Sequence, residues 1–218
     1  MADAPIPSTT DLRGPETERL PIGVVDADRF QRAIAAIDAA NAGDPNVLVI
    51  DGDEHPKELA HARLATAWVW WFDPQASEEQ LLAARAHHLR RWASPRDEFP
   101  RDRAGYLRWR AALKRQHAED VGAIMRAAGY DDEDAARVGQ IVRKEGLARD
   151  ADVQTHEDAL CLVFVQTQLQ WLTDEVGDDR IVPIVQKTMK KMSERAIEAV
   201  GRLELGPDAL AVLERASH

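Results

Sequence analysis

The feature that most constrains the fold of this chain is helical periodicity, interrupted at intervals by helix start and stop signals. Apolar residues recur at helical spacing from Phe30 to Ala40, and a capping box at 77–80 opens another such segment. No two segments form a convincing pair of strands, and the apolar run 47–50 is interpreted as a buried extended loop. The pattern predicts an all-α fold of about eight helices packed around one core.

The expected helices and the domain boundary follow from capping and breaking residues. The longer helices are expected over about 28–40, 56–72, 77–92, 102–127, 131–145 and 153–175, with shorter ones behind Ser193 and Pro207. Residues 1–25 are rich in proline, threonine and charge without periodicity, which predicts a disordered or loosely packed tail. Residues 26–218 are then expected to form a single helical domain, a length that suits one full core.

Composition limits the cellular setting and the classes of partner. No apolar run approaches the roughly 20 residues that a bilayer span requires, and the first residues lack the pattern of a signal peptide. The lone Cys161 fits a reducing compartment, so a soluble cytoplasmic protein is expected. The net charge of -10 argues against general affinity for nucleic acids or membrane surfaces.

One basic segment, residues 85–115, departs from this acidic average. It holds ten lysines and arginines against three acidic residues, about +7, which leaves about -17 for the rest of the chain. These side chains either lie on solvated helix faces and pair with acidic neighbours, or they form an anion-binding surface. The sequence leaves both interpretations open.

Histidines and carboxylates on separate expected helices are the residues with chemical potential. Imidazoles and carboxylates from different helices build divalent-metal sites in helical bundles, for example for Mn, Fe, Co or Zn. Glu58 and His61 share a helix face, whereas the consecutive His87 and His88 should point about 100 degrees apart, with His88 inward. The alternative is that each histidine is a hydrogen-bonded core residue and each tryptophan a packing residue. The favoured metal ligands are Glu58, His88, His117 and Asp158, followed by His61, His87 and Glu157.

Two resemblances to known families refine these expectations. The pattern Arg91-Trp92, Pro95-Arg96, Phe99-Pro100, Gly105-Tyr106-Leu107 and Trp109-Arg110 resembles the hallmark of domain-of-unknown-function family 4202. That resemblance extends from about Arg29 to Met192 and implies a family without an activity.

The second, weaker resemblance is to HD-domain phosphohydrolases, helical proteins that hold a metal with a histidine, a His-Asp pair and a distant aspartate. His61-x-Arg63, the segment 83–89, the helix from His117 and the segment 155–158 are similar to that family's ligand-bearing segments. The resemblance implies an HD-like helical bundle. However, His88 stands where the pair has its aspartate, and positions 163–165 are apolar where the last aspartate belongs. Either the site is rebuilt from the favoured ligands or the scaffold has lost its metal.

The leading hypothesis is therefore a rearranged divalent-metal site that hydrolyses a phosphate ester or nucleotide. The expected substrate-binding residues are Arg91, Arg96, Arg103, Tyr106, Arg110 and Lys114. A rival hypothesis is a non-catalytic module that binds a nucleotide or RNA through residues 85–115. A third is a structural or partner-binding protein in which the arginines form internal salt bridges.

Overall fold

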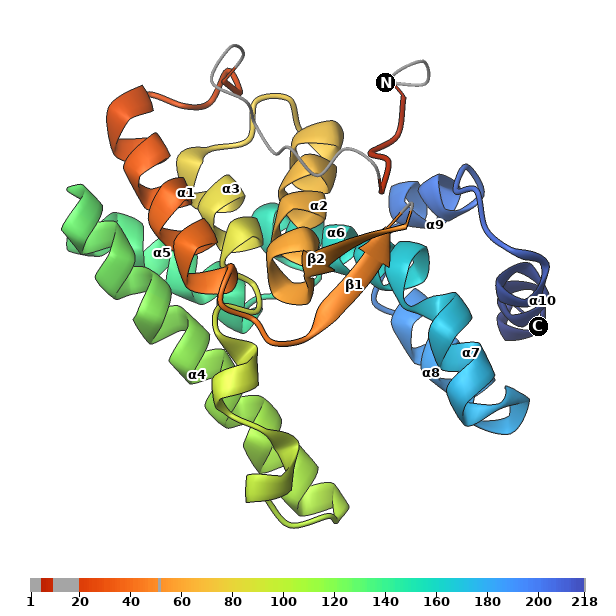
Figure 1. Ribbon diagram of the computed structural model, residues 1–218. Coiled ribbons are helices and arrows are strands. Elements are labelled where there is room, and N and C mark those ends of the chain that lie inside the picture. The colour runs from red at the N-terminus through yellow and green to blue at the C-terminus, as the bar shows by residue number, and fades with distance from the viewer. Residues whose placement is uncertain (1–4, 10–19, 51, 218) are drawn as a thin grey trace.

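Helices make up most of the computed structural model, which describes residues 5–9, 20–50 and 52–217 (Figure 1). Within those residues the chain forms ten α-helices, two 3₁₀ helices and one two-stranded sheet, more helices than the eight or so expected. In chain order they are α1 (Ala27–Asn41), β1 (Val47–Ile50), β2 (Asp53–Pro56), α2 (Lys57–Phe72), α3 (Glu78–Arg85), η1 (Arg91–Ala93), η2 (Arg96–Glu98), α4 (Arg103–Ala128), α5 (Asp132–Arg143), α6 (Ala151–Thr167), α7 (Leu169–Val176), α8 (Asp178–Met189), α9 (Glu194–Val200) and α10 (Pro207–Ala216).

The helix starts predicted from capping residues are confirmed. Ser77 and Gln80 form a complete capping box at α3, and Asp102 accepts a hydrogen bond from the backbone N–H of Gly105 at α4. Asp131 caps α5 in the same way. These side-chain oxygens satisfy the first backbone N–H groups of a helix, which have no partner within it.

Helix α2 lies at the centre of the fold and packs against both α3 and α6, while α4 lies along α5. The buried side chains form one continuous cluster that includes Phe30, Leu64, Trp68 and Leu162. The N-terminal end of α4 projects from the body, as do α7 and α8 on another side (Figure 1). None of the described helices combines the length and apolarity needed to cross a membrane.

The expected loop at 47–50 is wrong, because these residues form an antiparallel hairpin with 53–56. Val47 faces Pro56 and Ile50 faces Asp53 in the register, and only Ile50 of the first strand is buried. The sequence signal was weak because the partner strand, Asp-Glu-His-Pro, has neither alternation nor β-branched residues. The hairpin delivers the chain directly into α2.

Two helices end earlier than predicted. Helix α3 stops at Arg85 instead of near Trp92, and a turn follows in which Arg90 adopts a left-handed conformation (φ 52°) and donates its N–H to the Asn41 side chain. The predicted helix over 153–175 is divided at Gln168 into α6 and α7.

The tail expected over residues 1–25 is described only in part. Residues 1–4 and 10–19 lie outside the described residues, so the prediction for them stays a prediction. Where the chain is described, the Pro7 carbonyl accepts a hydrogen bond from Gln166, and the Val25 N–H donates to Glu78.

Candidate metal centre

A cavity of about 420 Å³ lies where α2, the turn after α3, α4 and α6 meet the ends of α7 and α8. This volume is in the range of small-molecule sites. One wall is apolar and includes Leu160, Phe164 and Leu172. The rest of the lining includes histidines, two glutamates and several cationic side chains. The cavity therefore offers both apolar surface and groups that bind metals or anions.

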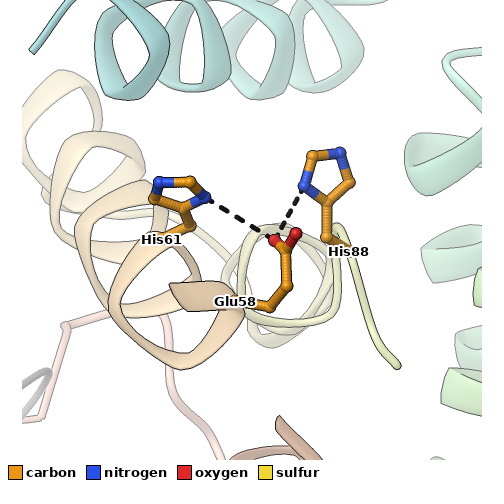
Figure 2. Close-up of side chains that lie close together, drawn as sticks. All are labelled: Glu58, His61 and His88. Atoms are coloured by element: carbon orange, nitrogen blue, oxygen red, sulfur yellow. Dashed lines mark hydrogen bonds and ion pairs between the residues drawn. The ribbon is translucent and has the colours of Figure 1, made fainter. Parts of the chain in front are cut away.

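Three of the polar side chains in this wall converge on one point. The Glu58 carboxylate lies between two imidazoles, with Oε2 2.9 Å from His88 Nδ1 and 3.6 Å from His61 Nδ1 (Figure 2). One ligand atom from each residue lies within 4.8 Å of the others. An ion with bonds of about 2.1 Å in tetrahedral geometry places its ligand atoms about 3.4 Å apart. The cluster could therefore hold a metal ion, with positions left open for substrate.

Local structure explains why these three residues meet. Glu58 and His61 lie on the first turns of α2, one helical turn apart, and Asp44 fixes that helix end by accepting the Glu58 N–H. His88 arrives from the turn that follows α3, which the left-handed Arg90 closes. The i, i+3 pair is thus local, whereas the third side chain depends on how α3 packs against α2.

The hydrogen bonds of His61 indicate that its Nδ1, the ring nitrogen nearer to the Glu58 carboxylate, carries no proton. Thr167 donates its hydroxyl hydrogen to the Val163 carbonyl at 2.7 Å, so it accepts from His61 Nε2 at 3.2 Å. In a neutral ring the proton then lies on Nε2 and the lone pair on Nδ1. A lone pair 3.6 Å from a carboxylate oxygen is unfavourable alone, and a cation between them would satisfy both.

The protonation states of the cluster suit metal binding. Burial would raise the pKa of the Glu58 carboxyl, but the neighbouring His88 holds that pKa well below the usual range. Burial lowers the pKa of His88 to about 4, against the opposing effect of Glu58. At neutral pH the carboxylate is ionised and His88 is neutral, which are the forms that ligate metals.

Two of the four favoured ligands do not join the cluster. Asp158 is fully buried, but its oxygens accept hydrogen bonds from the N–H and hydroxyl of Ser193 and from the Gln154 amide. This carboxylate fixes the start of α9 and lies outside the cluster. His117 donates Nδ1–H to the Leu89 carbonyl, and its ring centre lies 6.0 Å from that of His88. It lies next to the cluster and outside it.

Of the three less favoured metal ligands, one belongs to the cluster and the other two line the cavity outside it. His61 is part of the cluster. Glu157 lines the cavity but pairs with Lys144 and, at 3.6 Å, with Lys191. His87 and His88 stack with ring centres 3.9 Å apart and both line the cavity. The expectation that they cannot face one site is wrong, because the helix on which it rested ends at Arg85.

The basic segment serves two purposes. Arg91, Tyr106 and Arg110 line the cavity, and Lys114 lines a smaller recess beside it. Arg96 instead donates to the carbonyls of Phe99 and Pro100, and Arg103 is exposed at the start of α4. Neither residue lines the cavity.

Other aromatic and basic side chains of the segment have structural contacts. Arg85 forms a buried two-point ion pair with Asp38. Trp109 is buried under Arg91, and its indole N–H donates to the Ser94 carbonyl. Trp109 is therefore a packing residue, as the sequence suggested for the tryptophans as a group.

Sequence reasoning missed three residues. Lys144 and Lys191 line the cavity, and His156 is buried in α6 with neither ring nitrogen bonded. Burial lowers the pKa of His156 to about 3. The sequence carries no signal for Lys144, because a lysine at a helix end is common on exposed surfaces. Here it adopts a left-handed conformation (φ 60°) that usually belongs to glycine.

Comparison with known proteins gives a family and no activity. The family described as "Domain of unknown function (DUF4202)" matches residues 31–213, which is most of the chain. No curated protein and no solved structure shows a significant match. The resemblance in the Arg-Trp and Tyr-Leu-x-Trp-Arg region is thus confirmed, and the chain belongs to the DUF4202 family.

Proposed function

We propose that this protein is a metal-dependent phosphohydrolase that acts on a phosphate ester or nucleotide. The observation that carries the proposal is the meeting of Glu58, His61 and His88 with several cationic side chains in one cavity. Two imidazoles and one carboxylate form a ligand set used by Zn, Fe, Mn and Co, and three protein ligands leave positions open for catalysis. A divalent ion here would supply Lewis-acid chemistry for cleavage of a phosphoryl bond.

The cationic side chains explain why a phosphate is the favoured substrate group. Arg91, Arg110 and Lys191 all line the cavity. Arg91 NH1 lies 4.0 Å from Glu58 Oε1, so its guanidinium is next to the proposed metal position. Guanidinium and ammonium groups neutralise the charge that a phosphoryl group carries into the transition state. The apolar wall would receive the rest of the substrate.

An HD-like arrangement is part of the same proposal. His61 and the pair His87-His88 occupy the positions that resemble the HD-domain ligand segments, and two of these three residues belong to the cluster. Glu58, one turn before His61, would replace the missing aspartate as the carboxylate ligand. Asp158 has no place in this arrangement, because Ser193 and Gln154 occupy its oxygens.

The rival proposal, a nucleotide- or RNA-binding module without turnover, rests on Tyr106. This ring is 45 % exposed and lines the cavity, where a base could stack on it. The buried Trp109 cannot offer a second platform in its present position. A binding module predicts an affinity that falls steeply with salt and does not depend on Glu58.

The test combines metal analysis with a matched pair of variants. Protein purified without chelator should contain stoichiometric metal, or be stabilised by added Mn, Fe, Co or Zn, and should hydrolyse p-nitrophenyl phosphate in a manner that EDTA abolishes. Glu58→Ala should lose both properties. Glu54→Ala removes an exposed glutamate four residues earlier and should keep both. Absence of bound metal and of metal stabilisation in the unsubstituted protein would refute the proposal.

A further inference from the structure

A second hollow adjoins the cavity and has a different character. This recess measures about 20 Å³ and shares with the cavity the walls formed by His87, His88, Arg91, Arg110 and Lys144. Its remaining walls come from Leu113, Lys114, His117 and Val142. This volume is about that of one water molecule, so the recess can receive a single oxygen atom of a larger group that lies mainly in the cavity.

The lining of the recess is strongly cationic. Arg91, Arg110, Lys114 and Lys144 contribute positive charge, and no carboxylate is among its lining residues. Arg110 has no ion-pair partner among the described residues, and Lys114 donates to the Arg143 carbonyl at 3.0 Å, a neutral group. Burial lowers the pKa of Lys114, and the nearby Lys144 and Arg110 lower it further. Lys144 is paired with Glu157 and Arg91 lies 4.0 Å from Glu58, whereas Arg110 and Lys114 have no carboxylate within ion-pair distance among the described residues.

The recess also contains polar atoms that lack partners. His117 is 3 % exposed and uses Nδ1–H to bond the Leu89 carbonyl, which leaves Nε2 without a hydrogen bond. His87 Nδ1 is unpartnered as well. Because the proton of His117 lies on Nδ1, Nε2 is a hydrogen-bond acceptor, so it favours an occupant that donates, such as a protonated phosphate oxygen or a water molecule.

Backbone conformation places two of the cations. Lys144 follows α5 in the left-handed region, where its side chain reaches Glu157 and the cavity. Arg90, directly before Arg91, is also left-handed. Among the described non-glycine residues, Ala148 alone shares this property with them. Strained conformations of this kind tend to persist at functional sites.

We propose that the recess, together with the cavity wall that it shares, binds a second anionic group of the substrate, so that the substrate class is a diphosphate or a bisphosphate. This inference rests on the proposed phosphohydrolase function. The cavity and recess together carry five cationic side chains, Arg91, Arg110, Lys114, Lys144 and Lys191, against the two carboxylates Glu58 and Glu157. The excess of three positive charges is more than one phosphate dianion neutralises, even before a metal ion is added. A second metal ion in the recess is disfavoured by the same cations.

The two hollows would then divide the work. The phosphoryl group to be cleaved lies at Glu58, His61 and His88, and the second anionic group lies at the mouth of the recess, with one oxygen directed into it toward Lys114 and Arg110. Lys144, which lines both hollows, lies between them. A substrate fixed at two anionic points is held in one orientation, which favours attack at a single phosphoryl group.

The experiment measures binding of inorganic pyrophosphate and inorganic phosphate to chelator-treated protein by isothermal titration calorimetry. Pyrophosphate should bind more tightly than phosphate, and Lys114→Ala should weaken pyrophosphate about tenfold, toward the affinity of phosphate. Lys114→Arg keeps the charge and should restore most of the loss. Arg115→Ala is the matched control, since it removes an exposed cation from the next position of α4 and should change neither affinity.

Three results would overturn the inference: equal affinity for the two anions, equal effects of Lys114→Ala and Arg115→Ala, or no effect of Lys114→Ala. If Lys114→Ala does not fold, Arg110→Ala with the exposed Arg108→Ala as control gives the same comparison. The titration uses chelator-treated protein, so it measures anion binding independently of metal binding. Selective pyrophosphate binding by a protein that has no metal affinity would refute the proposed phosphohydrolase function and leave the second anion site standing. Metal binding without pyrophosphate selectivity would refute the second anion site alone.

Discussion

Two glutamates of this protein occupy equivalent positions in different regions and have opposite surroundings. Glu58 lies in the first turn of α2 and Glu78 in the first turn of α3, and the side chains of both are almost fully buried. The pKa of each carboxyl is below its usual value although burial acts in the other direction. Burial and ionisation therefore do not distinguish them.

The difference lies in their hydrogen-bond partners. Glu78 Oε1 accepts the N–H groups of Val25 and Asp26, and Oε2 accepts from Arg29 and from the Tyr130 hydroxyl. All of these donors belong to fixed parts of the fold, so the carboxylate joins the N-terminal segment, α1 and the end of α4. Its bonding capacity is filled.

Glu58, in contrast, faces two imidazoles and a cavity. Oε2 accepts one direct hydrogen bond, from His88 Nδ1, and the nearest cation to Oε1 is the Arg91 guanidinium at 4.0 Å. The comparison teaches that a buried carboxylate marks a candidate site when its bonding capacity is unfilled and it borders a cavity. Asp158 resembles Glu78 in this respect, because its carboxylate accepts hydrogen bonds from Ser193 and Gln154.

The largest effect is expected from acid, which should reduce the stability of the folded protein. The buried histidines that cause this loss lie near Glu58 and not around Glu78. Burial lowers the pKa of His88 to about 4 and of His117 and His156 to about 3, and lowers that of His87 well below its usual value. Because the unfolded chain binds these protons near pH 6.5, folding is stabilised above that pH and loses stability as the pH falls toward 3. Each imidazole contributes up to about 1.4 kcal/mol per pH unit.

Urea unfolding at pH 7.5, 6.5 and 5.5 measures this slope. His156→Leu removes one buried titrating group and should flatten the dependence by about one proton. A stability that does not change between pH 7.5 and 5.5 would contradict the buried, neutral state of these histidines.

The next largest effect is expected from Glu78→Ala. The substitution leaves Tyr130, Arg29 and two backbone N–H groups without their acceptor, so the free energy of unfolding should fall by about 3–5 kcal/mol. Denaturant unfolding at pH 7.5 is the measurement. Glu79→Ala is the adjacent control, because this half-buried side chain does not share the contacts of Glu78, and it should change stability by less than about 0.5 kcal/mol. A small effect of Glu78→Ala would remove the contrast with Glu58.

Glu58→Gln should have its main effect on metal-dependent stability. A saturating metal at about 100 times its dissociation constant adds about 2.7 kcal/mol to the stability of the unsubstituted protein. The variant should lose this increment because one of three ligands is replaced by a weaker one. Thermal shift with and without Mn or Zn measures it. An equal shift in the variant would show that Glu58 does not hold the metal.

The smallest effect is expected where Asp158 fixes α9. Ser193→Ala removes the hydroxyl that donates to Asp158 at the helix start and should cost about 1 kcal/mol in unfolding free energy, without change in metal affinity. Calorimetric unfolding and metal titration of the same variant check both parts. A loss of metal binding would return Asp158 to the set of ligands.

The sequence by itself determined most of the helices and the local half of the candidate site. Capping residues such as Ser77, Asp102 and Asp131 act on their own backbone within three residues, so local sequence is sufficient to place those helix starts. The pair Glu58 and His61 follows from helical spacing for the same reason. The hairpin was missed because its second strand has no strand-like residues.

Only the tertiary structure decided which remote residues join that pair. The turn after Arg85 brings both His87 and His88 to the cavity, and the left-handed Lys144 directs its cation to the same place. Asp158 and Glu78 are carboxylates and so could ligate a metal, yet their oxygens accept hydrogen bonds from Ser193 and Tyr130, respectively. These donors lie 35 and 52 positions away in the chain. Sequence spacing fixes which side chains share a helix face. Whether a buried carboxylate has all of its hydrogen-bond donors or can still bind a ligand depends on the packing between helices, which no local pattern encodes.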